Sequence, residues 1–389
     1  MSRRQLRLSI RRKDRLTSLP DEILEHIISY LLTKDAVTIS FLLKRWKSLW
    51  RSQLNLHFDD KTFQDPFAFR QFLHSVITKR DNTLPIHSFH LISRHDYNTD
   101  FYNFVYSSAI TRGVQNLSID LCSIRTTLPT FVLSSKTLSV LKLKRLALIE
   151  ISYDDDPCFD LPSLKLLHLE SVAFTYHKHM RKLLLSACPI LEELKVKDLI
   201  VMKRANELRP NRDGQIISNL VRANISGSNI AIHWLHNVQH LRIKPRWNYF
   251  LHGPVFHNLI HIELIFEFRY PSDSLEWSWL MELLKNSSKL QTLIINEVDT
   301  VDNFGDREWK DPEIVPECLL SNLTTCSLRN YKRTNCEFQF AKYIIQNSRV
   351  LSTMTIQSST HVDTNTKLQM LKELSLCPRN SATCKLLFT

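Results

Sequence analysis

The segment "LPSLKLLHLE" fills residues 161–170 and places three leucines, Leu164, Leu167 and Leu169, in the spacing Leu-x-x-Leu-x-Leu. Successive side chains of a β-strand point to opposite faces, so the last two leucines share one face. The residue between them, His168, and the one after them, Glu170, then share the other face. A single triplet of this kind is weak evidence, because apolar residues are common, and its weight depends on recurrence.

The triplet recurs along most of the chain, with other apolar residues in place of some leucines. Eleven triplets are present: Ile86/Phe89/Leu91, Val114/Leu117/Ile119, Leu138/Leu141/Leu143, Leu164/Leu167/Leu169, Leu191/Leu194/Val196, Leu220/Ala223/Ile225, Val238/Leu241/Ile243, Leu259/Ile262/Leu264, Leu290/Leu293/Ile295, Leu323/Cys326/Leu328 and Leu351/Met354/Ile356. Their middle residues are separated by 28, 24, 26, 27, 29, 18, 21, 31, 33 and 28 positions. These steps scatter around the 20–29-residue period of leucine-rich repeats, and eleven triplets at such spacing do not arise readily by chance.

Several segments between the triplets have the pattern of helices. Examples are "HKHMRKLLLSAC" (177–188), "EWSWLMELLKNSS" (276–288) and "EFQFAKYIIQNS" (337–348). One strand and one helix in each repeat predict an α/β solenoid, with a parallel sheet on its concave side.

Composition excludes several classes of protein. Apolar residues make up 43% of the 389 residues and charged residues 23%, which is ordinary for a folded soluble protein. No stretch approaches the ~20 apolar residues of a membrane-spanning helix, and the basic N-terminus is not followed by the apolar run of a secretory signal. The eight cysteines show no CxxC pair and no zinc-ligand spacing, so we expect reduced thiols.

The net charge of +12 is unevenly distributed. Residues 1–15 hold seven Lys or Arg and one Asp, a net charge of +6, so half of the excess lies in a short tail. Three interpretations remain open: a solvated disordered end, a nuclear-import signal, or an arm that attracts nucleic acid. The expected location is the nucleus, the cytoplasm or both.

A second informative stretch is "SLPDEILEHIISYLLTKDAVTISFLLKRWKSLW", residues 18–50. It is too short to enclose its own apolar side chains. Ile23, Ile27 and Leu31 form one i, i+4 stripe, and a neighbouring stripe consists of Leu24, Ile28 and Leu32. A helix that is apolar around most of its circumference must be covered on two sides. Three short helices that pack together can cover one another on one side only. Another molecule, or the next domain, must cover the other side.

Residues 14–50 resemble the plant F-box motif in the Leu19–Pro20 start, the 33–36 turn, and Lys44, Arg45 and Trp46 followed by Trp50. The resemblance implies docking on the Skp adaptor of Skp–cullin–F-box ubiquitin ligases, with the adaptor as the missing cover. The expected adaptor-binding residues are Leu19, Pro20, Ile23, Ile27, Leu31, Val37, Arg45 and Trp46. The sequence departs from the usual motif at Leu32 and Leu43, where Pro and Ser are common.

The C-terminal pieces "VPECLLSNLTTCSLRNYK" (315–332), "AKYIIQNSRVLSTMTI" (341–356) and "KLQMLKELSLCPRNSATCKLLF" (367–388) resemble the plant FBD domain. They have the pattern strand, helix, strand, helix, strand, which would continue the solenoid and cap its open edge. The expected organisation is a basic tail (1–13), an F-box (14–60), a leucine-rich-repeat solenoid (61–311) and an FBD domain (312–389).

Catalytic motifs are absent from the sequence. Five glycines leave no GxGxxG and no phosphate loop, and GxSxG does not occur. We therefore expect no enzyme, no cofactor and no metal site, but a substrate receptor that binds the Skp adaptor, through it cullin, and an unknown target protein through the repeats. Two alternatives are a nucleic-acid-binding protein acting through the basic tail and an F-box scaffold without ligase activity.

Strand alternation also predicts which residues face outward from the repeats. They are Ser118/Asp120, Lys142/Lys144, His168/Glu170, Lys195/Lys197, Asn224/Ser226, Arg242/Lys244 and Glu263/Ile265. The middle of this ladder is basic, which suggests an acidic or phosphorylated target segment bound by Lys142, Lys144, Lys195, Lys197, Arg242 and Lys244. The alternative is that exposed strand positions simply favour long solvated side chains.

Overall fold

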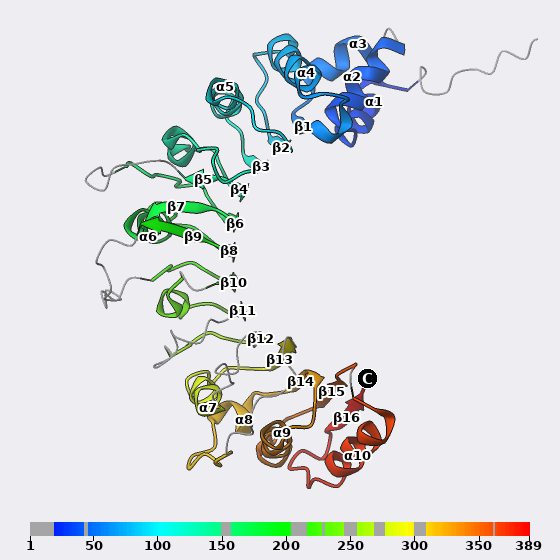
Figure 1. Ribbon diagram of the computed structural model, residues 1–389, viewed down its shortest axis with the longest axis vertical. Helices are drawn as coiled ribbons and strands as arrows, with labels where there is room; N and C mark the ends of the chain where they lie inside the picture. Colours follow the sequence, from blue (N-terminus) through cyan, green and yellow to red (C-terminus); the bar gives the residue numbers. More distant parts are fainter. Residues whose placement is uncertain are drawn as a thin grey trace, which may run out of the picture. The chain divides into compact units, whose positions relative to one another are not determined.

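The computed structural model describes residues 19–42, 46–148, 157–203, 216–227, 230–244, 255–267, 277–298, 309–360 and 362–389. The chain divides into an N-terminal unit, Met1–Ser123, and a C-terminal unit, Ile124–Thr389 (Figure 1). The basic tail and the expected adaptor contact Arg45 lie outside the described residues.

The N-terminal unit combines short helices with a small parallel sheet. Its helices are α1 (Asp21–Ser29), α2 (Thr33–Leu42), α3 (Trp46–Leu49), α4 (Pro66–Lys79) and α5 (Thr99–Ile110), with 3-10 turns η1 (Trp50–Ser52) and η2 (Asp60–Thr62). Its strands are β1 (Asn55–Asp59), β2 (Ser88–Ile92) and β3 (Asn116–Asp120), and β2 pairs in parallel with both of the others. The helices α4 and α5 connect successive strands, which is the strand–helix alternation expected of the repeats.

Local sequence signals explain where α4 and α5 begin. The side chain of Asp65 accepts a hydrogen bond from the backbone N–H of Ala68 at 2.8 Å, and Pro66 occupies the first turn of α4. Asn98 caps α5 in the same way, through the N–H of Phe101 at 3.2 Å. Such caps satisfy backbone donors that have no partner inside the helix, and each typically stabilises a helix by about 1 kcal/mol.

The three N-terminal helices are joined to the first repeat by buried polar contacts. Thr33 Oγ1 accepts from the backbone N–H of His57 in β1 at 2.8 Å. Gln53 Nε2 donates to the carbonyl of Ile28 at 3.1 Å, and the buried Arg80 donates to the carbonyl of Gln53 at 2.9 Å. The segment that resembles an F-box is therefore packed into one compact unit with the strands that follow it.

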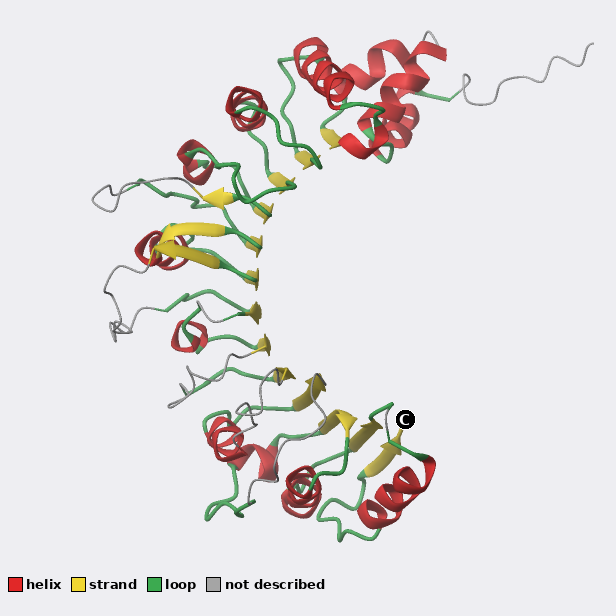
Figure 2. Ribbon diagram, in the orientation of Figure 1, coloured by secondary structure: helices red, strands yellow, loops and turns green. Residues whose placement is uncertain are grey.

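The C-terminal unit contains a large parallel sheet in which every described neighbouring pair is parallel. Its strands, in spatial order, are β4 (Val140–Lys144), β6 (Leu166–Glu170), β8 (Glu193–Lys197), β10 (Arg222–Ser226), β11 (His240–Lys244), β12 (His261–Glu267), β13 (Thr292–Val298), β14 (Thr325–Tyr331), β15 (Thr353–Ser358) and β16 (Lys385–Phe388). The helical segments are η3 (Thr130–Ser134), α6 (His177–Leu185), η4 (Ile232–Leu235), α7 (Trp277–Lys285), α8 (Glu317–Ser321), α9 (Asn335–Asn347) and α10 (Thr364–Ser375). The strands of this sheet line one side of the unit and the helices lie on the other (Figure 2). The predicted fold class, a helical N-terminal segment followed by α/β repeats with a parallel sheet, is confirmed.

The triplets supply the core beneath the sheet. Every residue of the eleven triplets is buried, and none exposes more than 6% of its surface. In the strand register, Leu141 lies beside Leu167, and Leu167 beside Leu194, so equivalent leucines stack from one repeat to the next. Burying one such side chain contributes about 2 kcal/mol, and each repeat buries three of them.

A second, smaller sheet was not predicted. It consists of β5 (Ala147–Leu148), β7 (Ala173–Tyr176) and β9 (Ile200–Lys203). Each of these strands follows a residue in the left-handed region that ends the preceding main strand: Arg145 (φ 54°), Ser171 (φ 52°) and Asp198 (φ 51°). A left-handed backbone conformation turns the chain sharply and is usually adopted by Gly or Asn. Arg145 and Ser171 are neither, so the sequence did not predict these turns.

The C-terminal segment continues the same sheet, as predicted. After α8, which was not expected, it runs β14, α9, β15, α10 and β16, and β14 pairs in parallel with β13. Thr334 and Glu337 form a capping box at the start of α9, in which each side chain bonds the other residue's backbone N–H. The strand β16 is the last in the sheet.

Candidate functional site

The helix α1 presents an apolar stripe on each of two sides. Leu24 and Ile28 are buried, with 0% and 1% of their surface exposed. The other stripe contains Ile23, which is 47% exposed, the half-buried Ile27, and Tyr30, directly after the helix, which is 77% exposed. The chain therefore covers one side of α1 and leaves the other apolar side in contact with solvent.

The remaining residues expected to contact an adaptor differ in accessibility. Pro20 is exposed, and Leu19, Leu31 and Val37 are half-buried. Trp46 was also expected to contact the adaptor, but it is only 2% exposed and packs inside the N-terminal unit.

Sequence reasoning missed two exposed aromatic residues. Phe41 on α2 is 82% exposed and follows Val37 at i, i+4 spacing. Tyr30 follows Ile23 at i, i+7 and Ile27 at i, i+3 spacing, a signal that was available in the sequence. We call Ile23, Ile27, Tyr30, Val37 and Phe41 the apolar helical residues.

The strand face is the outward surface of β4, β6, β8, β10, β11 and β12 in the C-terminal unit. Its middle row, in strand register, is Lys142, His168, Lys195, Asn224, Arg242 and Glu263. The next row toward the strand ends is Lys144, Glu170, Lys197, Ser226 and Lys244. The six basic residues predicted to bind a target thus lie on these two rows.

Two features of the strand face differ from the prediction. Ile265 was expected to face outward, but it is 7% exposed and belongs to the core, in the part of β12 that extends past its pairing with β11. A third row at the start of the strands was missed, with Glu193, Arg222, His240 and His261 on β8, β10, β11 and β12. Ser118 and Asp120 lie on β3 of the N-terminal unit.

Ion pairs neutralise much of the positive charge on the strand face. Glu170 lies 2.9 Å from Lys144 Nζ and 2.8 Å from Lys197 Nζ. Burial tends to raise the pKa of Glu170, but the two lysine hydrogen bonds outweigh it and hold that pKa at about 2. Arg242 is paired as well, with its Nε 3.0 Å from Glu263.

The middle of the strand face keeps two lysines without such pairing. Among the described residues, no carboxylate forms an ion pair with Lys142 or Lys195. Between them on β6 lies His168, whose Nε2 is 3.0 Å from Glu193 Oε1. Burial lowers the pKa of His168, although Glu193 acts to raise it, so burial disfavours the protonated imidazole.

The sheet changes character beyond β12. The outward positions of β13 to β15 are mostly hydroxyl and amide side chains: Thr292, Asn296, Thr325, Ser327, Thr353, Thr355 and Gln357, together with Ile294 and Arg329. Basic residues are therefore sparser beyond β12, where Arg329 on β14 lies 3.2 Å from Glu263 and Lys385 is exposed on β16.

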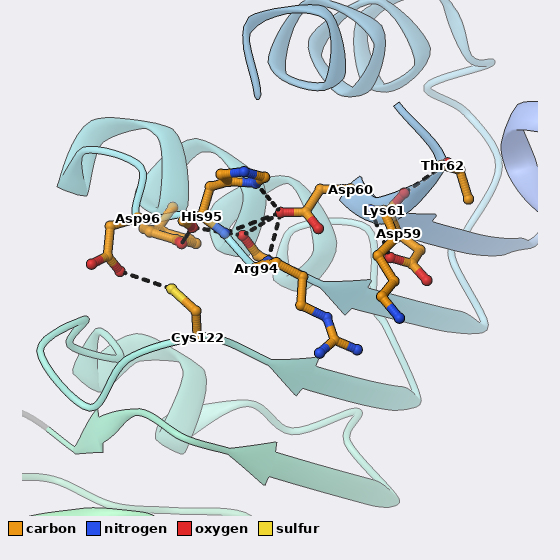
Figure 3. Close-up of polar contacts among 10 residues, drawn as sticks. Asp59, Asp60, Lys61, Thr62, Arg94, His95, Asp96 and Cys122 are labelled. Carbon is orange, nitrogen blue, oxygen red and sulfur yellow. Dashed lines mark hydrogen bonds and ion pairs between the residues drawn. The ribbon is translucent and has the colours of Figure 1, made fainter. Parts of the chain in front are cut away.

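A buried carboxylate in the N-terminal unit organises the ends of β1 and β2 (Figure 3). Asp60 Oδ2 accepts from the backbone N–H groups of Arg94 and His95 at 2.6 and 3.2 Å, and His95 Nδ1 lies 3.0 Å away. Nearby, the Cys122 thiol donates to Asp96 at 3.2 Å. Burial and this hydrogen bond raise the pKa of Cys122 to about 11, so it is not a thiolate nucleophile at neutral pH.

Neither a metal centre nor a membrane span is found in the part of the chain that the structure describes. There, no three His, Cys, Asp or Glu side chains come together as ligands for an ion. Likewise, none of the described helices has the length and apolar character needed to cross a bilayer.

Comparison with known proteins identifies both ends of the chain. The F-box domain family matches residues 16–58, from before α1 through most of β1, and the FBD family matches residues 311–356, from before α8 into β15. The FBD-associated F-box protein At5g56370 of Arabidopsis thaliana is 30% identical over 434 residues, covering 96% of this chain and 100% of the relative. The chain belongs to the family of FBD-associated F-box proteins.

The names of other Arabidopsis thaliana relatives contain F-box and FBD, and one of them also contains LRR-repeat. FBD-associated F-box protein At4g10400 is 29% identical over 97% of this chain, and F-box/FBD/LRR-repeat protein At4g26340 is 28% identical over 96%, each along its full length. The resemblances to F-box, leucine-rich-repeat and FBD proteins are thereby confirmed. In this F-box protein the apolar helical residues lie within the F-box match, and the strand face lies between the two matched segments.

Proposed function

We propose that this F-box protein is the substrate-recognition subunit of a Skp–cullin–F-box ubiquitin ligase. Its apolar helical residues bind the Skp adaptor, and its strand face binds a target protein. The observation that carries the proposal is the second apolar side of α1, where Ile23 and Tyr30 remain 47% and 77% exposed within the F-box match.

Adaptor binding removes this apolar surface from water. The gain is roughly 25 cal/mol per Å² of apolar area, and aromatic anchors at the centre of an interface are worth ~2 kcal/mol or more each. Because the opposite stripe of Leu24 and Ile28 is fixed in the core, α1 presents Ile23 and Ile27 in a fixed orientation. Little ordering is then needed on binding, which favours affinity.

The contribution of this chain to ubiquitin transfer is proximity. A receptor that holds a target and the adaptor together raises the effective concentration of the target's lysines near the charged conjugating enzyme. The bond-forming chemistry belongs to other subunits of the ligase. The strand face suits a target with negative charge, because Lys142 and Lys195 carry no internal counter-charge among the described residues.

A capture experiment with purified Skp adaptor tests the proposal. The wild-type chain should retain the adaptor, and Leu19→Ala/Pro20→Ala should retain little of it, because both residues border the start of α1 and neither is buried. Undiminished capture by the double variant would contradict this adaptor surface.

Ubiquitylation in a reconstituted ligase then separates a receptor from a scaffold. A receptor should direct ubiquitin to proteins that co-purify with it in plant extracts, and removal of the adaptor should abolish that transfer. Adaptor binding without any transfer to co-purifying proteins would favour the non-ligase scaffold.

A further inference from the structure

Two rows of the strand face run across β4, β6 and β8 and differ in their charge balance. One row is Lys142, His168 and Lys195, and the other is Lys144, Glu170 and Lys197. In both rows, lysines from β4 and β8 flank a β6 residue in the same parallel register. The rows therefore share their geometry and differ in the residue at the centre.

In the row centred on Glu170, the two lysines have a counter-charge within the row. Its carboxylate contacts Lys144 at 2.9 Å and Lys197 at 2.8 Å, so one anion bridges two ammonium groups across three strands. This arrangement shows that lysines on β4 and β8 reach a single anionic group above β6.

The row centred on His168 has the same two cations but no anionic residue at its centre. The imidazole contributes no negative charge, and its Nε2 lies 3.0 Å from the carboxylate of Glu193. No described carboxylate is paired with Lys142 or Lys195, and both lysines are exposed. Two flexible ammonium groups thus flank a position where an external anion can take the place that Glu170 holds in the next row.

We propose that Lys142 and Lys195 together bind one phosphate group of a phosphorylated segment of the target protein. The inference rests on the proposed function and specifies the chemistry of its target. Adjacent parallel strands lie ~4.8 Å apart, so the two lysines come from strands about 10 Å apart, within reach of one group above β6. A phosphoryl group carries about −1.5 to −2 charge at pH 7 and has three strong acceptor oxygens. It therefore balances the charge of two ammonium groups better than a single carboxylate does.

The test uses the full chain bound to the Skp adaptor on beads. The probes are two peptide libraries with random flanks, one with a fixed phosphoserine and one with a fixed serine. The wild type should retain the phosphoserine library about tenfold better, and Lys142→Gln/Lys195→Gln should bring the ratio near one.

A matched control comes from the neighbouring row. Lys144→Gln/Lys197→Gln removes the same charge from the same two strands, but from lysines already paired with Glu170. It should keep most of the preference for phosphoserine. Equal loss in both double variants would indicate a diffuse charge effect and overturn the assignment to Lys142 and Lys195.

Changes at the centre of each row test the proposal without touching the lysines. His168→Glu makes the middle row equivalent to the next one and should abolish the preference, since the new carboxylate pairs with both lysines. Glu170→Gln frees Lys144 and Lys197 and should increase retention of the phosphoserine library. A His168→Glu variant with the wild-type preference would contradict the proposal.

Failure of the proposal is distinguishable from failure of the proposed function. Adaptor retention is read on the same beads, so loss of adaptor binding by the wild type would count against the ligase role. Normal adaptor binding with equal retention of the two libraries would overturn only the phosphate site. Binding of a soluble inositol polyphosphate, with no preference between the libraries, would also overturn it by assigning the lysines to a small-molecule ligand.

Discussion

The outer side of α1 and the strand face of the C-terminal unit are both exposed, yet their chemistry is opposite. On α1 the exposed stripe contains Ile23 and Ile27, with Tyr30 next to it, whereas the strand face carries Lys142, Lys195 and a set of ion pairs. An apolar stripe in water is unfavourable, and a solvated lysine is not. Exposure alone therefore does not mark a binding surface. An exposed group indicates binding when neither water nor a neighbouring residue interacts favourably with it.

The two surfaces also predict different responses to ionic strength. Burial of apolar side chains is little affected by moderate salt, whereas interactions between exposed charges are screened within ~10 Å at 0.1 M. Adaptor capture should therefore persist as salt rises, and target capture should weaken. The experiments below test this contrast.

The largest effect is expected on α1, where adjacent residues face opposite ways. Ile23→Asp places a charge on the exposed stripe and should weaken adaptor binding by about 100-fold, with little change in unfolding temperature. Leu24→Ala, one residue on, removes a fully buried side chain and should lower the free energy of unfolding by about 2–5 kcal/mol. Adaptor titration and thermal unfolding of both variants measure the contrast. Normal adaptor affinity in Ile23→Asp would show that this side of α1 is not the docking surface.

A smaller effect is expected from charge reversal on the strand face. Lys195→Glu/Lys197→Glu should reduce target capture by about tenfold or more, and adaptor binding should be unchanged. Quantitative comparison of proteins cross-linked to the wild type and the variant in plant cells provides the measurement. In a separate pull-down without cross-linking, the captured target should dissociate as salt is raised from about 0.05 to about 0.5 M, while the adaptor stays bound. Target capture that withstands both changes would rule out the strand face.

The smallest effect concerns stability, through the carboxylate that bridges two lysines. The pKa of Glu170 is held at about 2 in the folded chain, below its ordinary value of 4.5, so the charged form favours folding above pH 4.5 and this benefit disappears as pH falls toward 2. Glu170→Gln should cost about 1 kcal/mol at pH 7, a value reduced by the exposure of both lysines. Denaturant unfolding at several pH values should show the difference shrinking below about pH 5. A difference independent of pH would mean that packing, not charge, explains the effect.

Much of the fold and part of the candidate site could be predicted because their signals are local. The eleven triplets placed the core residues of the strands, and strand alternation placed Lys142, Lys195 and Arg242 on one outward surface. The exception, Ile265, lies in the part of β12 that extends past its pairing with β11, where the neighbouring Phe266 is buried as well. Alternation is a weak guide where a strand extends past its neighbour, because burial there depends on tertiary packing and not on the local pattern.

The spacing of the repeats, the parallel sheet and the two apolar stripes on α1 could be read from the order of the residues alone. These follow from side-chain periods of 2 and 3.6 residues, which are properties of the local backbone. Only the tertiary structure decided that Leu24 and Ile28 face the core while Ile23 faces solvent, that Trp46 is buried, and that Glu170 neutralises Lys144 and Lys197 but leaves Lys142 and Lys195 unpaired among the described residues. The reason is that burial and ion pairing depend on neighbours from other helices and strands, and a local pattern carries no information about which neighbours will be in contact.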